Sequence, residues 1–344
     1  MDPILECIPN FSEGRDPAVL DAIAAAIQSV AGVKLLHLDQ GVSAHRTVMT
    51  FAGEPEAVVE AAFQAIRTAA ARIDMRQHVG THPRMGATDV CPLVPVRGIT
   101  IEQAKRLARQ LAQRVGEELG IPVYLYEQSA SAPHRANLAT VRAGEYEGFR
   151  DKILRPEWQP DFGPTQFNAR TGQTVIGVRD FLVAYNLNLN TRSVELAQAV
   201  ACDIRTRGRV KRENGAVLRD ADGKALREPG RCRALKAIGW YIEEYGVAQV
   251  SCNVTSLGQT AVHEAFEAGR TAARARGLRV TGSELIGLIP LQALLAAGRY
   301  YLAAQGATQE ASEAEMVHIA VRSLGLNELA PFEPKQRVIE YLLA

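Results

Sequence analysis

The apolar segments of this chain follow the same order twice, and this repetition limits the folds available to it. Segments with apolar residues at helical spacing alternate with short runs typical of strands, so each half reads strand, helix, strand, strand, helix, strand. In the first half, strands are expected at 4–8, 33–38, 46–52 and 90–96, and in the second half at 181–189, 235–242, 247–254 and 284–289. A βαββαβ unit forms an antiparallel sheet with helices on one face. The sequence therefore predicts an α+β protein of two tandem ferredoxin-like subdomains that arose by internal duplication.

The length of 344 residues suits two domains, which we expect at 1–179 and 180–344. Residues 151–179 are rich in Pro and Gly, show little periodicity and are interpreted as a linker that ends the first domain. Loops of this length usually bind something or are disordered, and Trp158, Phe162 and Phe167 argue against disorder. We expect a ligand-binding cleft between the two domains.

Charge and composition exclude several classes of protein. The formal net charge of +1 gives no reason to expect binding to nucleic acid or a membrane surface. No stretch approaches the roughly 20 apolar residues of a membrane helix, and Met1-Asp2-Pro3 lacks the features of a secretory signal. The five cysteines are scattered without a C-x-x-C pair, which is typical of reduced thiols. We therefore expect a cytoplasmic protein.

Arginine and lysine concentrate in one stretch of the second half, residues 205–236. One interpretation is a solvated hairpin inserted between a helix and a strand, with a turn at Asp222-Gly223. The other is a basic wall that receives an anionic substrate tail. We favour the hairpin for 211–227, and the flanking residues stay open to either interpretation.

The loop Gly80–Pro92 concentrates side chains capable of acid/base chemistry. His82 titrates near neutrality and could accept and return a proton within one turnover. Arg84 could hold a carboxylate in a bidentate fork, and Asp89 could orient an imidazole. An ordinary structural loop is an equally good interpretation of these residues taken alone.

Two further groups of residues extend these hypotheses. His78 and His82 have the spacing of metal ligands on a helix, but Gly80 and Pro83 argue against a helix there. Asp39, His45 and Arg46 form a second polar group where two expected strands meet a loop. The chain has no dinucleotide fingerprint, P-loop or nucleophile elbow. From the residues alone we expect an acid/base enzyme that acts on an anionic small molecule.

Several long motifs closely resemble the glutamate formimidoyltransferase family, which also forms the transferase part of formimidoyltransferase-cyclodeaminase. They run through essentially the whole chain and include Cys7-Ile8-Pro9-Asn10-Phe11-Ser12-Glu13-Gly14, Arg46-Thr47-Val48, His82-Pro83-Arg84-Met85-Gly86-Ala87, Asp89-Val90-Cys91-Pro92, Pro95-Val96-Arg97-Gly98, Pro122-Val123-Tyr124-Leu125-Tyr126, Arg142-Ala143-Gly144-Glu145-Tyr146-Glu147, Pro160-Asp161-Phe162-Gly163-Pro164, Ile238-Gly239-Trp240-Tyr241 and the C-terminal residues 334–342.

The resemblance implies two ferredoxin-like subdomains, a homodimer and a role in histidine degradation. It implies transfer of the formimidoyl group from N-formimidoyl-L-glutamate to N5 of tetrahydrofolate, giving 5-formimidoyltetrahydrofolate and L-glutamate. Tetrahydrofolate, with or without a polyglutamate tail, is then a co-substrate, and no cofactor is permanently bound. The family's catalytic histidine matches His82, and its folate-binding stretch matches Gly163, Pro164, Thr165, Gln166, Phe167, Asn168, Ala169, Arg170, Thr171 and Gly172.

This sequence departs from the family pattern in three places. The middle of the folate-binding stretch differs, and the basic insert 211–227 is longer than usual. The chain ends at Ala344 without a cyclodeaminase domain, so ring closure is expected to need a separate protein.

A mechanism follows from the resemblance and the chemistry of the residues. His82 takes the N5 proton and returns it to the departing glutamate amine, while Asp39 or Asp89 steadies the imidazolium. Arg46 and Arg84 are candidates to hold substrate carboxylates. The alternatives are a related folate-dependent formyltransferase, a metal-dependent hydrolase using His78 and His82, and a non-catalytic folate-binding protein.

Overall fold

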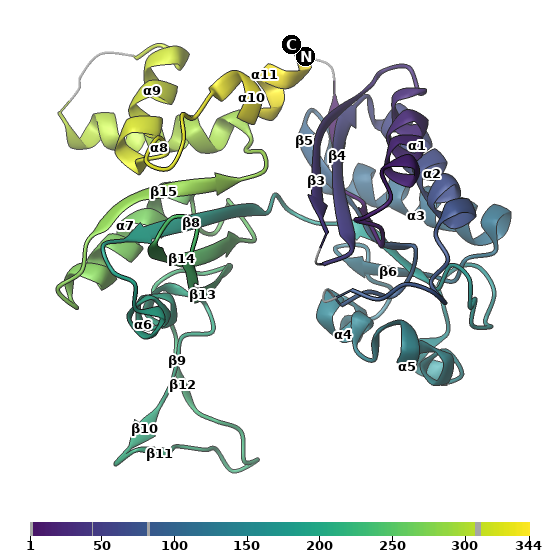
Figure 1. Ribbon diagram of the computed structural model, residues 1–344, viewed down its shortest axis with the longest axis horizontal. Coiled ribbons are helices and arrows are strands. Elements are labelled where there is room, and N and C mark those ends of the chain that lie inside the picture. Colours follow the sequence, from purple (N-terminus) through teal and green to yellow (C-terminus); the bar gives the residue numbers. More distant parts are fainter. Residues whose placement is uncertain (1–2, 43, 81–82, 307–310) are drawn as a thin grey trace. The chain divides into compact units, whose positions relative to one another are not determined.

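A computed structural model describes residues 3–42, 44–80, 83–306 and 311–344, which divide into two units at residues 179 and 180 (Figure 1). The first unit is a mixed sheet with helices, and the second is an antiparallel sheet with helices. The protein is thus of the α+β class with two domains. Within the described ranges, no helix is both long and apolar enough to cross a bilayer.

The sheet of the first unit has seven strands and an interrupted central strand. Its spatial order is β3, β4, the β1–β2 pair, β5, β7 and β6, and β5, β7 and β6 run parallel while the others pair antiparallel. The strands span Ile4–Cys7 (β1), Asn10–Phe11 (β2), Val33–Gly41 (β3), Arg46–Gly53 (β4), Thr88–Arg97 (β5), Val123–Glu127 (β6) and Thr174–Val178 (β7).

Three long helices of the first unit begin where the sequence predicts. Asp16 caps α1 (Pro17–Gln28) by accepting from the amide of Ala18, and α2 (Pro55–Arg72) begins at a proline. Thr100 and Gln103 form the predicted capping box of α3 (Ile101–Leu119). Together these helices cover one face of the sheet in a mainly aliphatic core that includes Leu5, Ile23, Ile66 and Leu111, together with Phe51.

A smaller core lies on the opposite face, over β5, β7 and β6. Tyr124 and Tyr126 point to this face, while their neighbours Val123 and Leu125 point into the larger core, as strand alternation requires. This smaller core is closed by α4 (Leu138–Arg142), α5 (Glu145–Lys152) and the 3₁₀ turns η1 (Pro133–Arg135) and η2 (Pro156–Trp158).

The interpretation of residues 151–179 as a linker is wrong. Trp158 is buried in the smaller core, and β7 pairs with both β5 and β6 inside the sheet. The segment therefore supplies an interior strand of the first unit's sheet. The sequence did not predict this strand, because the many Pro and Gly residues indicated a loop. Pairing between distant segments also leaves no local periodicity.

The second unit is a four-stranded antiparallel sheet in the order β13, β14, β8, β15. Its strands span Val183–Leu189 (β8), Leu235–Ile242 (β13), Val247–Val254 (β14) and Val280–Ile286 (β15). The core packs α6 (Val194–Ile204) and α7 (Val262–Arg274) with α8 (Leu291–Ala304) and α9 (Glu313–Leu324), and α10 (Pro334–Arg337) and α11 (Ile339–Leu343) follow. The two sheets share an order of strands. In the first sheet β5, β1–β2, β4 and β3 lie side by side, and in the second β15, β8, β14 and β13 do. Counted along the chain within each sheet, with β1–β2 as one strand, both orders are fourth, first, third, second.

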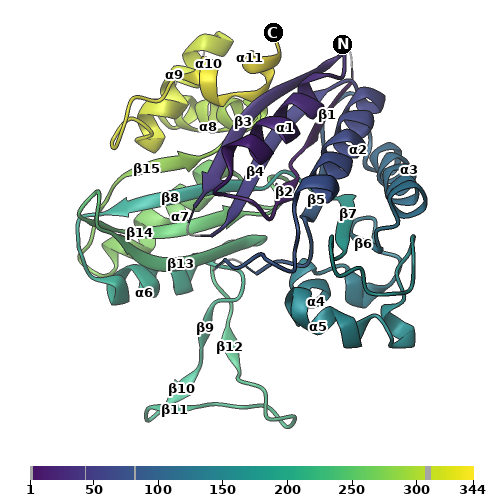
Figure 2. The same cartoon turned by 45° about the vertical axis from the view of Figure 1, so that its right-hand side comes forward.

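The basic stretch forms a two-stranded arm that extends away from the sheet of the second unit (Figures 1 and 2). Its stem pairs β9 (Arg209–Val210) with β12 (Arg227–Glu228), and a side hairpin pairs β10 (Arg212–Glu213) with β11 (Ala216–Val217). The predicted turn is present: Arg219 pairs with Ala225, and Gly223 has a φ of +76° that favours glycine. The hairpin interpretation of 211–227 is confirmed.

Candidate active site

The backbone of the first unit brings the two predicted functional segments together. Gly86 pairs with Gly172 as an isolated bridge, and the amide of Ala87 donates to the carbonyl of Thr171 at 2.8 Å. A Cβ at Gly86 would lie 2.2 Å from the carbonyl oxygen of Gln173, so only glycine allows this approach. Residues 85–87 of the loop Gly80–Pro92 therefore lie against the end of the stretch 163–172.

His82, the predicted proton-transfer residue, lies outside the described residues, as does Thr81. The described residues on either side of them show where the loop is anchored. A Cβ at Gly80 would meet the carbonyl oxygen of Ala44 at 2.4 Å, so this part of the loop lies against the connection between β3 and β4. At the other end, the carbonyl of Arg84 accepts from the amide of Tyr146 at 2.9 Å.

A buried cluster of charges is centred on Asp89, whose side chain is fully enclosed. Its carboxylate accepts from Arg46 Nη1 at 2.6 Å, from Arg142 Nη2 at 2.7 Å and from the amide of Met85 at 3.0 Å. Arg46 also donates to Asn10 Oδ1 from Nε at 3.1 Å and from Nη2 at 2.6 Å. Burial lowers the pKa of Arg46, which Asp89 opposes, and the group stays a cation at neutral pH. Among the described residues, acceptors engage three of its five N–H donors, and the other two are available to a ligand.

A second network of contacts includes two stacked imidazole rings. His45 lies 4.3 Å from His78 between ring centroids, and its Nε2 contacts Glu13 at 3.1 Å. His78 Nε2 donates to the carbonyl of His45 at 2.8 Å, so its Nδ1 is the acceptor for Arg84 Nε at 3.2 Å. Arg84 then binds Glu147 through both terminal nitrogens, at 2.8 and 2.6 Å.

Burial and these hydrogen-bond partners shift the pKa values in this second network. Burial lowers the pKa of His78, which favours the neutral ring that the hydrogen bonds require. Burial alone would raise the pKa of Glu13, but the amides of Asp16, Arg15 and Gly14 outweigh it and the pKa is lowered. The hydrogen bond to Glu147 raises the pKa of Arg84.

The predicted side chains differ in whether they are available to bind a substrate. Every N–H of Arg84 has an acceptor, namely Glu147, Glu145 or His78, so Arg84 would need to exchange partners to hold a carboxylate. Both ring nitrogens of His78 are engaged, which leaves no lone pair for a metal ion. Asp39 lies exposed on β3 in register with Val48, so it shares a sheet face with Arg46 but does not join the Asp89 cluster.

The predicted folate stretch has an exposed beginning and an anchored end. Gly163, Pro164, Thr165 and Gln166 are exposed, whereas Thr171 and Gly172 are buried. Asn168 holds the turn by accepting from the amides of Arg170 and Thr171 at 3.1 Å each. The hydroxyl of Tyr146 donates to the carbonyl of Ala169 at 2.5 Å, and its ring lies 5.2 Å from that of Phe167. The stretch is thus tied to α5, the helix that also supplies Glu147.

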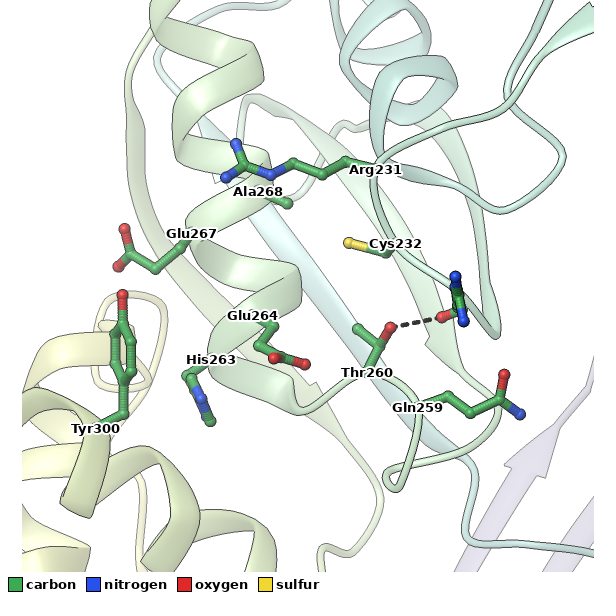
Figure 3. A pocket seen from close by; sticks show the side chains of 10 residues that line it. Arg231, Cys232, Gln259, Thr260, His263, Glu264, Glu267, Ala268 and Tyr300 are labelled. Atoms are coloured by element: carbon green, nitrogen blue, oxygen red, sulfur yellow. Dashed lines mark hydrogen bonds between the residues drawn. The ribbon is translucent and has the colours of Figure 1, made fainter.

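The second unit contains a cavity of about 440 Å³ beside the first turn of α7 (Figure 3). Arg231 and Arg233 line it together with Glu264, Glu267, His263 and Tyr300. Its charges are of both signs and partly paired, since Glu267 accepts from Tyr301 and Arg270. Arg231 and Arg233 belong to the basic stretch 205–236, whereas none of the residues predicted to be catalytic or to bind the donor or the folate in the first unit lines this cavity.

Two family models match the chain along nearly its whole length. The N-terminal subdomain of the formiminotransferase domain matches residues 4–179, and the formiminotransferase domain matches residues 184–344. The chain belongs to the formiminotransferase family. The resemblance to this family is therefore confirmed.

Relatives of this chain include proteins of two lengths. It is 46% identical over 343 residues to mouse formimidoyltransferase-cyclodeaminase, covering 100% of this chain and 60% of the mouse protein. It is 41% identical to glutamate formimidoyltransferase of Streptococcus pyogenes serotype M1, covering 88% of this chain and 94% of the relative. With the protein of that name from Thermoplasma acidophilum, the identity is 39% over 305 residues.

Sequence reasoning missed three side chains that shape the candidate site. Arg142 completes the Asp89 cluster, Glu147 occupies Arg84, and Tyr146 ties the folate stretch to α5. All three stand in the motif 142–147, which was noted only for its resemblance to the family. Their spacing on two short helices carried no chemical pattern, because their partners are distant in sequence.

Proposed function

We propose that this chain is a glutamate formimidoyltransferase that transfers the formimidoyl group from N-formimidoyl-L-glutamate to N5 of tetrahydrofolate. The products are 5-formimidoyltetrahydrofolate and L-glutamate. The observation that carries the proposal is the backbone pairing of Met85–Ala87 with Thr171–Gln173, which joins the loop of the family's histidine to the family's folate-binding stretch. Relatives with this name that match over nearly their full length support the same conclusion.

The chemistry needs one proton shuttle and a fixed electrophile. N5 attacks the formimidoyl carbon, the new C–N bond gives a tetrahedral intermediate, and the bond from that carbon to the glutamate nitrogen then breaks. His82 accepts the proton from N5 and delivers it to the departing amine, so protons balance within one turnover.

Charged groups of the first unit have separate roles in this proposal. Arg46 holds a carboxylate of the donor with its two free N–H groups, and Asp89 fixes its guanidinium in place. The carboxylate of Asp89 already accepts three hydrogen bonds, so Asp39, exposed on the same sheet face as Arg46, is the better candidate to steady the His82 imidazolium. Arg84 organises the loop through Glu147 and is the weaker candidate for substrate binding.

Residues 163–172 supply the binding surface for the folate in this proposal. The exposed residues 163–166 and the ring of Phe167 are available to the pterin and its aminobenzoyl group, while the anchored residues keep the stretch against the loop. Tetrahydrofolate is a co-substrate, and no permanently bound cofactor or metal takes part.

The broader expectations belong to the same proposal. The shared strand order of the two sheets supports two ferredoxin-like subdomains, 1–179 and 180–344, related by internal duplication. We further propose that the protein is a cytoplasmic homodimer that acts in histidine degradation. Sedimentation would test the oligomeric state, and cell fractionation would test the location.

The decisive experiment compares the wild type with His82→Asn and His82→Ala in the transfer assay. We expect a decrease of about 100- to 10,000-fold in kcat with a normal unfolding midpoint, because one positioned acid/base contributes that range. Parallel reactions supply tetrahydrofolate with either a formyl or a formimidoyl donor. Transfer from the formyl donor alone would indicate the related formyltransferase. Binding of tetrahydrofolate without turnover of any donor would indicate a non-catalytic folate-binding protein, and near-full turnover by folded His82→Ala would rule out the assigned role.

A further inference from the structure

Lys152, the last residue of α5, has its ammonium group buried against backbone carbonyls. Its Nζ donates to the carbonyl oxygens of Thr140 at 3.0 Å, Val141 at 2.6 Å and Ala143 at 3.0 Å. The residue is 7% exposed. An ammonium has three N–H donors, so these contacts use all of them.

The surroundings of Lys152 stabilise a cation without a carboxylate in hydrogen-bond contact. Nζ lies 3.8 Å from the ring centroid of Trp158 and 4.9 Å from that of Phe149, both within the range of cation–π attraction. Arg155, the charged group that lowers its pKa in addition to burial, has the same sign. The three carbonyls therefore take the place of a counter-ion.

Those carbonyls belong to the end of α4, a helix of five residues. So short a helix is marginal by itself, and its last carbonyls lack α-helical partners; the backbone partner of the Thr140 carbonyl is the amide of the C-cap residue Ala143, at 3.4 Å. Asn137 caps the amino end by accepting from the amide of Ala139 at 2.9 Å, and Lys152 caps the carboxyl end. A lysine in this place satisfies the carbonyls and opposes the helix dipole.

The last residue of α4 is Arg142, which contacts the buried cluster directly. Its Nη2 donates to Asp89 Oδ2 at 2.7 Å, and the same oxygen accepts from Arg46 Nη1 at 2.6 Å. The position of the helix end therefore sets how Asp89 is shared between two guanidinium groups. No other part of the proposed mechanism uses Lys152.

We propose that Lys152 is a positioning residue of the active site, whose ammonium fixes the carboxyl end of α4 and so holds Arg142 against Asp89. The kinetic part rests on the proposed function, since it needs Arg46 to bind the donor. The structural part, the order of α4, does not.

The kinetic test uses two substitutions at one position and a matched control. Lys152→Met keeps an unbranched side chain but removes the charge and the donors, and we expect the KM for N-formimidoyl-L-glutamate to rise by about 10- to 100-fold, as for a small displacement of a binding group. The kcat should change much less, and Lys152→Arg, which keeps charge and donors, should restore most of the affinity. Lys105→Met, at a half-exposed lysine of α3 in the larger helical layer, should match the wild type. An unchanged KM in Lys152→Met would overturn the proposal.

The pH dependence gives a readout that a purely structural role would not move. Burial lowers the pKa of Lys152 to about 8, and Arg155 acts in the same direction. The other charged residues of the elements packed around it are Glu145, Glu147, Arg150 and Asp151 on α5, Arg142 on α4, Arg135 on η1 and Glu157 on η2. A lysine in an unfolded chain has a pKa of about 10.4.

Deprotonation of Lys152 should change the free energy of unfolding and the KM in ways that can be told apart. Between pH 8 and about 10 the unfolded chain binds more protons at this group than the folded chain, so the free energy of unfolding rises with pH. Over the same range the neutral amine donates only two hydrogen bonds, so the KM for the donor should rise while stability increases. Lys152→Arg should show no such rise in KM, and an identical rise in this variant and the wild type would contradict the proposal.

Hydrogen exchange separates failure of this proposal from failure of the proposed function. If the wild type transfers no formimidoyl group, the function is wrong, but amides of 138–142 should still exchange at least about 10-fold faster in Lys152→Met while those of β5 do not change. Equal exchange in α4 would overturn the positioning role. If Lys152→Met does not fold, the comparison of the wild type with Lys152→Arg across pH 8–10 still decides.

Discussion

Replacing Asp89 with Asn tests the buried charge cluster most severely. The substitution keeps the size of the side chain but removes the charge that two guanidinium groups share, at 2.6 and 2.7 Å. The side chains of Arg46 and Arg142 are only 10% and 16% exposed, so water cannot replace the lost carboxylate. Removing one partner of a buried ion pair typically destabilises a protein by about 3–5 kcal/mol, and we expect Asp89→Asn to fall in this range.

The magnitude can be checked against two further substitutions. Arg142→Met removes one charge-assisted hydrogen bond but leaves Asp89 paired with Arg46, so we expect a loss of about 1.5–3 kcal/mol. The double variant removes one of the two stranded guanidinium groups, and its loss should be smaller than the sum of the single losses.

Urea unfolding followed by circular dichroism measures these differences, with Glu102→Gln as the control. Glu102 pairs with Lys105 on the exposed surface of α3, where a pair contributes about 0–1 kcal/mol. If Asp89→Asn changes the free energy of unfolding no more than Glu102→Gln does, the cluster does not stabilise the fold and the argument from burial is wrong.

Two other predictions concern the packing and the titration of the loop. Gly86→Ala should unfold at lower urea and lose transfer activity, because its Cβ would lie 2.2 Å from a carbonyl oxygen, whereas Gly148→Ala in the open interior of α5 should be neutral or stabilising by up to about 1 kcal/mol; equal effects would show that the approach of Gly86 to Gly172 is not needed. Burial lowers the pKa of His78 below its unfolded value, so the unfolded chain binds more protons here and the free energy of unfolding should fall as pH drops below about 6.5. His78→Gln should flatten this slope between pH 7 and 5, and a slope equal to that of the wild type would assign it to another group.

Local patterns predicted most of the elements but few of the contacts. The strands over 235–242 and 247–254, the capping box at Thr100 and the helix starts at Pro17 and Pro55 all follow from neighbouring residues, and the structure has them there. The place of β7 depends instead on pairing with β5, some 80 residues away, and no local signal marks it. Helix and strand propensity act over a few residues, whereas sheet order is a property of the whole fold.

Alternation in β8 illustrates a second limit. The sequence separates an apolar face from a face with Asn186 and Asn188, and such a polar face usually meets water. Both asparagines are buried, where they bind Glu284, Gln249 and Glu328. The pattern of one strand shows which residues share a face, but the partners that satisfy them come from other strands and from the loop after α9.

The candidate site shows the same division. Arg46, Asp89 and the loop of His82 could be singled out because they are charged residues next to strand ends. Arg142 and Glu147 could not, because their roles depend on how α4 and α5 pack against that loop. Chemistry-bearing residues are visible in a sequence, whereas the residues that position them become visible only through their contacts.

The most direct measurement follows the transferred carbon itself. The wild type is incubated with tetrahydrofolate and N-formimidoyl-L-glutamate carrying ¹³C in the formimidoyl group, and the label is followed by NMR. We expect the label to move to N5 of the folate as one glutamate is released for each group transferred, and we expect His82→Asn to abolish this movement. Label that stays on the donor, or that appears as formamide or formate without reaching the folate, would contradict the proposed function.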